Sequence, residues 1–324
     1  MTFRPLSGQP RDISVQKVEV IEYTDAVCST AWGAEPQLRL LDWRHGHHMT
    51  WRKVMGGLIG DLATGKDDWD RISAAEPMRA YWKRVWRLTG MPYPNPMHVM
   101  LQSTDPAGQA VKAAQLQGQE VGHAVLRRFR EEIFIFGVGP QTPDEFEAAT
   151  QGVAGLDHAR WRLDQTLPEV AGAYQADWRE TRAPNDYVRN LKHDSPMNGE
   201  LKHSEGHDRY ALPTLIFRGP GGDHTVAGWV DYADYVAGLE AALPGATADP
   251  RADPTPAEAF AKWGVLTGKE LEFICGHGSG PPDGVVTHDW GDGVVYFTPA
   301  EARARHWRRD LPFTPDISPS SQKA

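Results

Sequence analysis

The hydrophobic and polar positions of the first 60 residues predict a β-α-β unit. The segment VEVIEY, residues 18–23, is short, β-branched and aromatic, and it ends at Thr24 and Asp25, which predicts a buried strand. Apolar residues then follow the 3.6-residue helical period in AWGAEPQLRLLDWR, although Pro36 removes one backbone donor from that helix. The segment MTWRKVMGGL predicts a second strand around residues 51–55.

The pattern changes over the next hundred or so residues. Apolar residues recur at helical spacing in AYWKRVWRL, in AVKAAQLQGQEVGHAVLRRFREEIFIFG and in two later segments, with Pro and Gly between them. The segment YALPTLIFRGPGGDHTVAGWV, residues 210–230, then predicts two strands joined by a glycine-rich turn, and YADYVAGLEAAL predicts a helix. One sheet with a helical insertion is the simplest topology for this order.

A change of composition marks the C-terminal part of the chain. The stretch PGATADPRADPTP, residues 244–256, resembles a linker. Beyond it, AEAFAKWGVLTGKELEFICG predicts two short helices, and GVVTHDWGDGVVYF predicts a small hairpin with Asp-Gly near its turn. We expect a compact terminal module.

Composition and charge exclude several classes of protein. The 324 residues hold 43 acidic and 34 basic side chains, and the net charge of -9 opposes sequence-independent binding to nucleic acid. The two cysteines, Cys28 and Cys275, provide no disulfide framework, which suits a reducing compartment. The N-terminus lacks the apolar region of a secretory signal, and no apolar run reaches the length of a membrane span. We expect a soluble, cytoplasmic protein with no membrane partner.

Cys28 lies where the first strand gives way to a helix. A thiol in the first turn of a helix faces unpaired backbone N–H groups and the positive end of the helix dipole, and both favour the thiolate. We therefore expect the pKa of Cys28 to be lowered and the thiol to be nucleophilic. The alternative is a small buried side chain that happens to begin a helix. The redox pair C-x-x-C is incomplete, because Ala31 occupies its second cysteine position.

The order of these motifs resembles the DsbA-like branch of the thioredoxin superfamily. The shared features are a strand that ends in Thr-Asp, a cysteine at a helix start, Trp32 and Glu35-Pro36, the helical segments KAAQLQGQE and LRRFREEIF, a GLD sequence, and Leu212-Pro213-Thr214 at the start of a strand. In detail the chain resembles the cytoplasmic DsbA-type proteins that include FrnE-like dithiol-disulfide isomerases and DsbA-like adaptors of the ClpXP protease. The resemblance covers roughly residues 16–245.

The resemblance implies an α/β fold, with a thioredoxin-like mixed sheet, a large inserted helical domain and a small C-terminal module. The predicted ranges are 14–64 and 186–245 for the thioredoxin-like domain, 65–185 for the insertion and 255–312 for an α+β module. The family further implies that Pro213 is a cis-proline whose loop lies against the thiol. Ser29 and Thr30 are expected to tune the sulfur, and Trp32 to form a wall of the site. With Leu212 and Pro213, these residues make up the predicted substrate site around the catalytic Cys28.

The missing second cysteine leaves three functional hypotheses. The first is a monothiol thiol-disulfide oxidoreductase that binds no cofactor and acts on a protein or peptide substrate, with a small thiol such as glutathione as co-substrate. Resolution of the mixed disulfide by Cys275 or by a partner is another route, although Cys275 has the apolar neighbours of a core residue. The second hypothesis is a redox-inactive adaptor that binds a protein partner in the same groove. The third and weakest is a glutathione-dependent transferase or isomerase.

Two groups of histidines raise the possibility of a metal site, but the residues around them do not support one. The first is HGHH at residues 45–48, in a connection between a helix and a strand, and the second is His203-x-x-x-His207 in a polar segment. A zinc site needs ligands fixed in position, and neither group has a partnering carboxylate or cysteine in such a place. We therefore expect surface or loop histidines and no metal.

Overall fold

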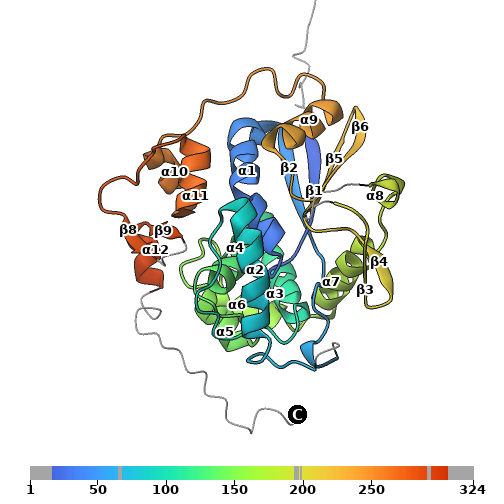
Figure 1. Ribbon diagram of the computed structural model, residues 1–324, viewed down its shortest axis with the longest axis vertical. Helices are drawn as coiled ribbons and strands as arrows, with labels where there is room; N and C mark the ends of the chain where they lie inside the picture. Colours follow the sequence, from blue (N-terminus) through green and yellow to red (C-terminus); the bar gives the residue numbers. More distant parts are fainter. Residues whose placement is uncertain (1–16, 65–67, 193–196, 198, 290–292, 306–324) are drawn as a thin grey trace, which may run out of the picture.

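A mixed four-stranded sheet organises the first and third quarters of the chain. The computed structural model describes residues 17–64, 68–192, 197, 199–289 and 293–305 (Figure 1). The strands are β1 (Val18–Thr24), β2 (Met49–Met55), β5 (Thr214–Gly219) and β6 (Gly222–Ala227), in the order β2-β1-β5-β6. β1 runs parallel to β2 and antiparallel to β5, and β5 and β6 form the predicted hairpin, in which Gly219 pairs with Gly222.

Helices cover both faces of this sheet. On one face, α1 (Ser29–His45) and α9 (Tyr232–Ala242) pack on alternate strand residues such as Val20, Leu215 and Phe217. The opposite face carries Ile21, Tyr23 and Ile216, next to α7 (Pro168–Thr181) and α8 (Asp186–Asn190). A short 3-10 turn, Gly46–His48, links α1 to β2 and contains His47 and His48. The expectation of a surface or loop histidine was wrong for His45, which is the last residue of α1 and is buried. The sheet is therefore the middle layer, and Cys28 lies at the end of its central strand.

The chain between β2 and β5 is mainly helical. It begins with a 3-10 turn, Leu62–Thr64. Besides α7 and α8, its helices are α2 (Ala75–Thr89), α3 (Asp105–Gln115), α4 (Gln119–Phe134), α5 (Pro143–Ala149) and α6 (His158–Asp164). Their apolar faces form the largest hydrophobic core, in which Trp82, Phe129, Phe134 and Trp161 are buried. In Figure 1 these helices lie below the sheet.

The polar segment after α8 forms a small hairpin. Its strands are β3 (Lys202–Ser204) and β4 (His207–Arg209), with Glu205 and Gly206 at positive φ in the turn. His203 and His207 therefore lie on opposite strands, and their four-residue spacing is not helical. His203 Nδ1 instead lies 3.2 Å from a carboxylate oxygen of Asp208.

The C-terminal module consists of α10 (Pro256–Trp263), β7 (Val265–Thr267), α11 (Gly268–Cys275), β8 (Val286–Asp289), β9 (Val294–Phe297) and α12 (Pro299–Ala304). The strand order is β7-β9-β8. The expectation of two helices between residues 257 and 276 was incomplete, because the three-residue strand β7 separates them. The turn residue Asp292 of the predicted hairpin lies outside the described residues.

This module packs on the rest of the protein. α11 contacts α1, and Val265, Val295 and Phe297 belong to the same hydrophobic core as the inserted helices. The module lies beside α1 and α4 in Figure 1. The predicted ranges 14–64 and 255–312 extend into residues 14–16 and 306–312, which are outside the described residues. Within the part of the chain that is described, no helix is both long and apolar enough to span a membrane.

Candidate functional site

The first turn of α1 positions the Cys28 sulfur. Cys28 is the N-cap residue, with φ -75° and ψ 100°, and its sulfur accepts a hydrogen bond from the backbone N–H of Ala31 at 3.3 Å. The Cys28 N–H in turn donates to the carbonyl of Asp25 at 3.3 Å. An N-cap side chain that accepts from the first helical turn satisfies one of the unpaired donors there. The thiol is thus held in a fixed direction at the helix entrance.

The loop before β5 closes over this sulfur. The Cys28 thiol donates to the carbonyl oxygen of Leu212 at 3.3 Å, and the Thr30 hydroxyl donates to the same oxygen at 2.6 Å. The Leu212–Pro213 peptide bond is cis. The structure therefore brings Cys28, Thr30 and Leu212 into direct contact, with Pro213 next in the chain.

Burial controls the ionisation of the thiol. Cys28 is only 5% exposed, and desolvation raises its pKa above the ordinary value. Hydrogen bonds from Thr30 and Ala31, together with the charge of Arg130, oppose this rise without cancelling it. The expectation of a lowered pKa was wrong. A helix N-terminus favours a thiolate, but here the loss of hydration outweighs it.

With the thiol protonated, Cys28 and Thr30 both direct their protons to the Leu212 carbonyl. Thr30 has one hydroxyl proton, and the 2.6 Å contact directs it to Leu212. The Thr30 oxygen, 3.2 Å from the Cys28 sulfur, then faces that sulfur as an acceptor. In the thiolate form the Thr30 hydroxyl can turn to donate to the sulfur beside the Ala31 N–H, so these two hydrogen bonds oppose the rise of the thiol pKa that burial causes.

Two of the predicted site residues are placed differently from Thr30. Trp32 points into the core of the inserted helices, where its indole N–H donates to the Pro92 carbonyl at 2.8 Å and its ring stacks on Phe134. Trp32 therefore packs in the core of the inserted helices, whereas Cys28 belongs to the core beneath β1 and β5, and these contacts do not support Trp32 as a wall of the thiol site. Ser29 is buried at the start of α1, and the hydroxyl that reaches the sulfur is that of Thr30.

Charged residues that sequence reasoning did not select lie directly beneath the site. The Asp25 carboxylate accepts backbone hydrogen bonds from Val27 at 3.1 Å and Leu58 at 3.0 Å, and burial raises its pKa to about 6. Arg130 from α4 donates to the Thr24 hydroxyl and the Asp25 carbonyl. Asp25 is the residue at which the first predicted strand ends, and Arg130 lies in the segment LRRFREEIF. The signal for Arg130 was an arginine on the apolar side of an amphipathic helix.

An exposed apolar strip on α2 lies near the thiol. Tyr81 is 44% exposed and Leu88 is 51% exposed, and their spacing of seven positions amounts to about two helical turns, so they share one face. The pKa of Tyr81 is raised by burial and by the nearby Cys28 sulfur, and Arg209 from β4 is in electrostatic reach of both. The surface around the thiol therefore combines apolar and basic groups.

Cys275 lies elsewhere, at the end of α11. It packs against the core formed by Leu40, Phe260 and Ile274, whereas Cys28 belongs to the core beneath β1 and β5. Both cysteines are free, and burial raises the pKa of Cys275 to about 11. In this structure Cys275 is a partly buried side chain of the terminal module. Within the described residues no group of three metal-ligating side chains is found.

Comparisons with known proteins agree with this fold. A family model described as thioredoxin matches residues 22–183. The ClpXP adapter protein SpxH of Shouchella clausii is 28% identical over 167 residues, which are 51% of this chain and 53% of that protein. The SpxH of Bacillus subtilis is 25% identical over 139 residues, 41% of this chain and 42% of that protein. The chain thus spans about half the length of the curated relatives it matches.

A solved structure with the same architecture was also found. A protein from Nitrosomonas europaea, proposed to be a protein disulfide isomerase, has a TM-score of 0.52 at 14% identity and covers 69% of this chain and 97% of its own. The cytosolic disulfide reductase DsbM from Pseudomonas aeruginosa has a TM-score of 0.46 at 16% identity, with 68% and 93% covered. The predicted α/β fold with a mixed, thioredoxin-like sheet is confirmed, as is the resemblance to DsbA-like proteins.

Proposed function

The chain belongs to the thioredoxin family, and from that premise we propose that it is an adaptor, which holds a protein partner on the face around Cys28 without thiol turnover. The observation that carries this proposal is the state of the thiol. Its proton is donated to the Leu212 carbonyl, its pKa is raised by burial, and the residue at position 31 is alanine. A thiol in that state is a poor nucleophile at neutral pH.

The curated relatives also support an adaptor function. The SpxH proteins are named adapters of ClpXP, and that of Shouchella clausii matches 167 residues of this chain. The thioredoxin family model matches residues 22–183, which contain Cys28 and most of the inserted helices. For an adaptor, the exposed strip of Tyr81 and Leu88 supplies apolar contact area beside the thiol, and Arg84 lies over the Tyr81 ring at 5.3 Å. Aromatic and arginine side chains are the usual anchors of protein interfaces. The interaction would take place in the cytoplasm, where unpaired cysteines stay reduced.

Binding of purified ClpX, measured by biolayer interferometry, tests the adaptor proposal. We expect Cys28→Ser to keep the dissociation constant within two-fold of the wild type, and Tyr81→Glu to weaken it at least ten-fold. Leu163→Glu is the matched control, because Leu163 is 69% exposed on α6, outside the strip. Absence of ClpX binding, loss of binding in Cys28→Ser, or an equal loss in Leu163→Glu would overturn the proposal.

A second candidate is monothiol exchange at Cys28. The Ala31 N–H on the sulfur and the Leu212–Pro213 loop against it favour this chemistry. The thiol would first lose its proton to water. The thiolate would then attack a substrate disulfide, so that a bond to Cys28 forms while the substrate S–S bond breaks and the other sulfur leaves as thiolate. A low-molecular-weight thiol would release the enzyme by a second exchange of the same kind.

Mass spectrometry after incubation with oxidised glutathione distinguishes the two candidates. Monothiol exchange predicts a glutathione adduct on Cys28 that forms within minutes near neutral pH and is released by reduced glutathione. The adaptor proposal predicts that Cys28 stays unmodified under those conditions, because its thiol is buried and protonated. A glutathione-dependent transferase or isomerase activity is a weaker alternative that uses the same residue, and the same adduct experiment bears on it.

A further inference from the structure

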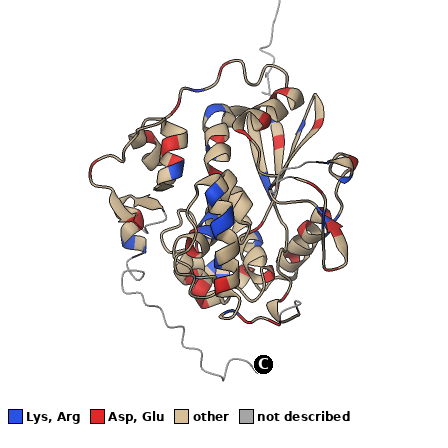
Figure 2. Cartoon of the chain, viewed as in Figure 1, with Lys and Arg blue, Asp and Glu red and all other residues tan. Residues whose placement is uncertain are grey.

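A large charged cavity lies between α1, α4 and the C-terminal module, and it is separate from the contacts around Cys28. Its volume is about 810 Å³, which is within the range of small-molecule sites in proteins. Figure 2 shows Lys and Arg residues on the helices at the centre of the view, whereas acidic residues are gathered on α5 below. This concentration of basic groups is unexpected in a chain with a net charge of -9.

An ion-pair network forms the inner wall of this cavity. Its basic members, within the part of the chain that is described, are Arg39, Lys53, Arg127, Arg128, Arg130 and Arg305. Its carboxylates are Glu22, Glu35, Glu131, Glu270 and Glu301. These six cations and five anions leave one positive charge in excess. Each cation has a carboxylate partner, but the six cations share five carboxylates, so an additional anion at this place would be stabilising.

The network also contains unused hydrogen-bond donors. Nη1 of Arg128, Nε of Arg130 and Nε of Arg305 have no hydrogen-bond partner among the described residues. All three side chains line the cavity and are at most 6% exposed. Burial lowers the pKa of Arg128, which fits a guanidinium whose charge is incompletely compensated. Guanidinium donors of this kind are suited to carboxylate and phosphate groups.

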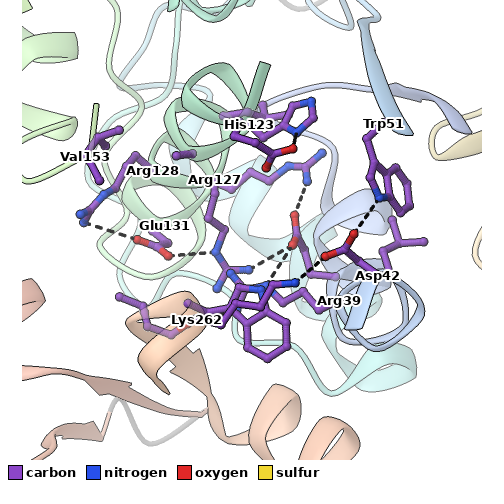
Figure 3. A pocket seen from close by; sticks show the side chains of 18 of the residues that line it. Arg39, Asp42, Trp51, His123, Arg127, Arg128, Glu131, Val153 and Lys262 are labelled. Carbon is purple, nitrogen blue, oxygen red and sulfur yellow. Dashed lines mark hydrogen bonds and ion pairs between the residues drawn. The ribbon is translucent and has the colours of Figure 1, made fainter. Parts of the chain in front are cut away.

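A second part of the cavity lining is aromatic. Trp43, Trp51 and Trp263 line the cavity, and Lys262 lies over the rings of Trp43 and Trp263. Figure 3 shows Trp51 on one side of the space and Arg128 on the other, with Arg39 and Lys262 pointing into the region between them. A ligand with a charged head and a flat or apolar body would match both parts of the lining.

We propose that this cavity binds a small organic anion, with its carboxylate or phosphate held by the arginines of α4 and its body against the tryptophans of α1, β2 and α10. Three separate parts of the chain make the site: the segment from α1 to β2, the inserted helix α4 and the terminal module. The bound anion supplies the negative charge that the network lacks. The site is independent of the thiol and of the adaptor proposal.

Isothermal titration of the full chain at fixed ionic strength tests this proposal. The probes are adenosine monophosphate and indole-3-acetate, each compared with its neutral counterpart, adenosine or indole-3-acetamide. We expect at least one anion to bind at least ten-fold more tightly than its counterpart, and to raise Tm by about 3–4 °C at 100 times its Kd. Equal affinity for both members of each pair, or no binding of either anion, would overturn the proposal.

A matched pair of substitutions locates the site. Ala124 lines the cavity on α4 and is partly buried. Ala124→Glu places a carboxylate there and should weaken anion binding at least ten-fold, whereas Ala124→Gln, of equal size, should keep it within three-fold. If either variant fails to fold, Ala154→Glu and Ala154→Gln replace the pair, because Ala154 lines the same cavity and is exposed. Unchanged binding in the Glu variant would place the anion elsewhere and refute the site.

Discussion

The Cys28 sulfur lies 3.3 Å from the carbonyl oxygen of Leu212, although 184 residues separate the two in the chain. Thr30 donates to the same oxygen, so that one carbonyl holds both the thiol and the neighbouring hydroxyl. This relationship joins the first helix to the loop before β5. It also leaves the thiol protonated, which is why we favour binding over exchange chemistry at this site.

Restoring the second cysteine should restore a redox pair. Ala31 is fully buried one turn after Cys28, and its N–H already contacts the sulfur. We expect Ala31→Cys to form a disulfide with Cys28 that dithiothreitol reduces, because helix-start cysteines at this spacing satisfy disulfide geometry in this fold. The measurement is the intact mass before and after reduction, together with insulin reduction. The double variant Cys28→Ser, Ala31→Cys is the control, and equal behaviour of the two variants would contradict the expectation.

The raised pKa of Asp25 makes stability depend on pH. An unfolded aspartate titrates near 3.9, whereas Asp25 titrates at about 6, so the folded state binds more protons between these values. Its contribution to stability therefore falls as pH rises from about 4 to about 6, by up to about 3 kcal/mol. Urea unfolding of the wild type and of Asp25→Asn across pH 4–8 measures this change in the free energy of unfolding. The wild type should lose stability relative to the variant over that interval, and a pH-independent difference would show that Asp25 titrates normally.

Arg130 should be one of the most sensitive positions of the protein. Its guanidinium is 1% exposed and lies between Glu22, Glu35 and Thr24. Arg130→Gln removes the buried ion pairs and the hydrogen bond that Arg130 makes with Glu22, Glu35 and Thr24, and should lower the free energy of unfolding by about 3–5 kcal/mol. The matched surface change Arg162→Gln should cost less than about 1 kcal/mol, because the Arg162 pair with Asp144 is exposed. Equal losses in the two variants would mean that the buried network is not formed.

The terminal module should unfold together with the rest of the chain. Phe297 of β9 is 1% exposed and stacks on Phe136, which follows α4. Phe297→Ala should therefore lower the unfolding free energy by about 3–5 kcal/mol in a single thermal transition. Calorimetry checks this expectation. Two separate transitions, with the loss confined to the smaller, would indicate that the module folds independently.

Local sequence patterns predicted those helices and strands whose own residues show a hydrophobic period or a turn motif. β1, α1, β2 and the β5–β6 hairpin follow from hydrophobic period and from the Gly-rich turn. The hairpin of β3 and β4 was missed because its residues are polar and its strands have only three residues each. β7 was also missed, because Val265–Thr267 is too short to show a hydrophobic period.

The properties of the site depended on tertiary contacts. Position 28 at a helix start was visible in the sequence, but the loss of hydration that raises the thiol pKa comes from elements far along the chain. Trp32 was assigned to the site by its distance in sequence, whereas its direction is set by Phe134 and by the Pro92 carbonyl. The partners of Arg130 lie on β1 and α1, and no local pattern connects those segments.

The rate of Cys28 alkylation as a function of pH tests the central claim most directly. Iodoacetamide labelling of Cys275→Ser, which leaves Cys28 as the one thiol, gives the pKa of that sulfur. We predict a midpoint above about 8.5, the value of a free thiol, because burial disfavours the thiolate. A midpoint near pH 6 with rapid labelling would contradict the account and restore Cys28 as an attacking nucleophile.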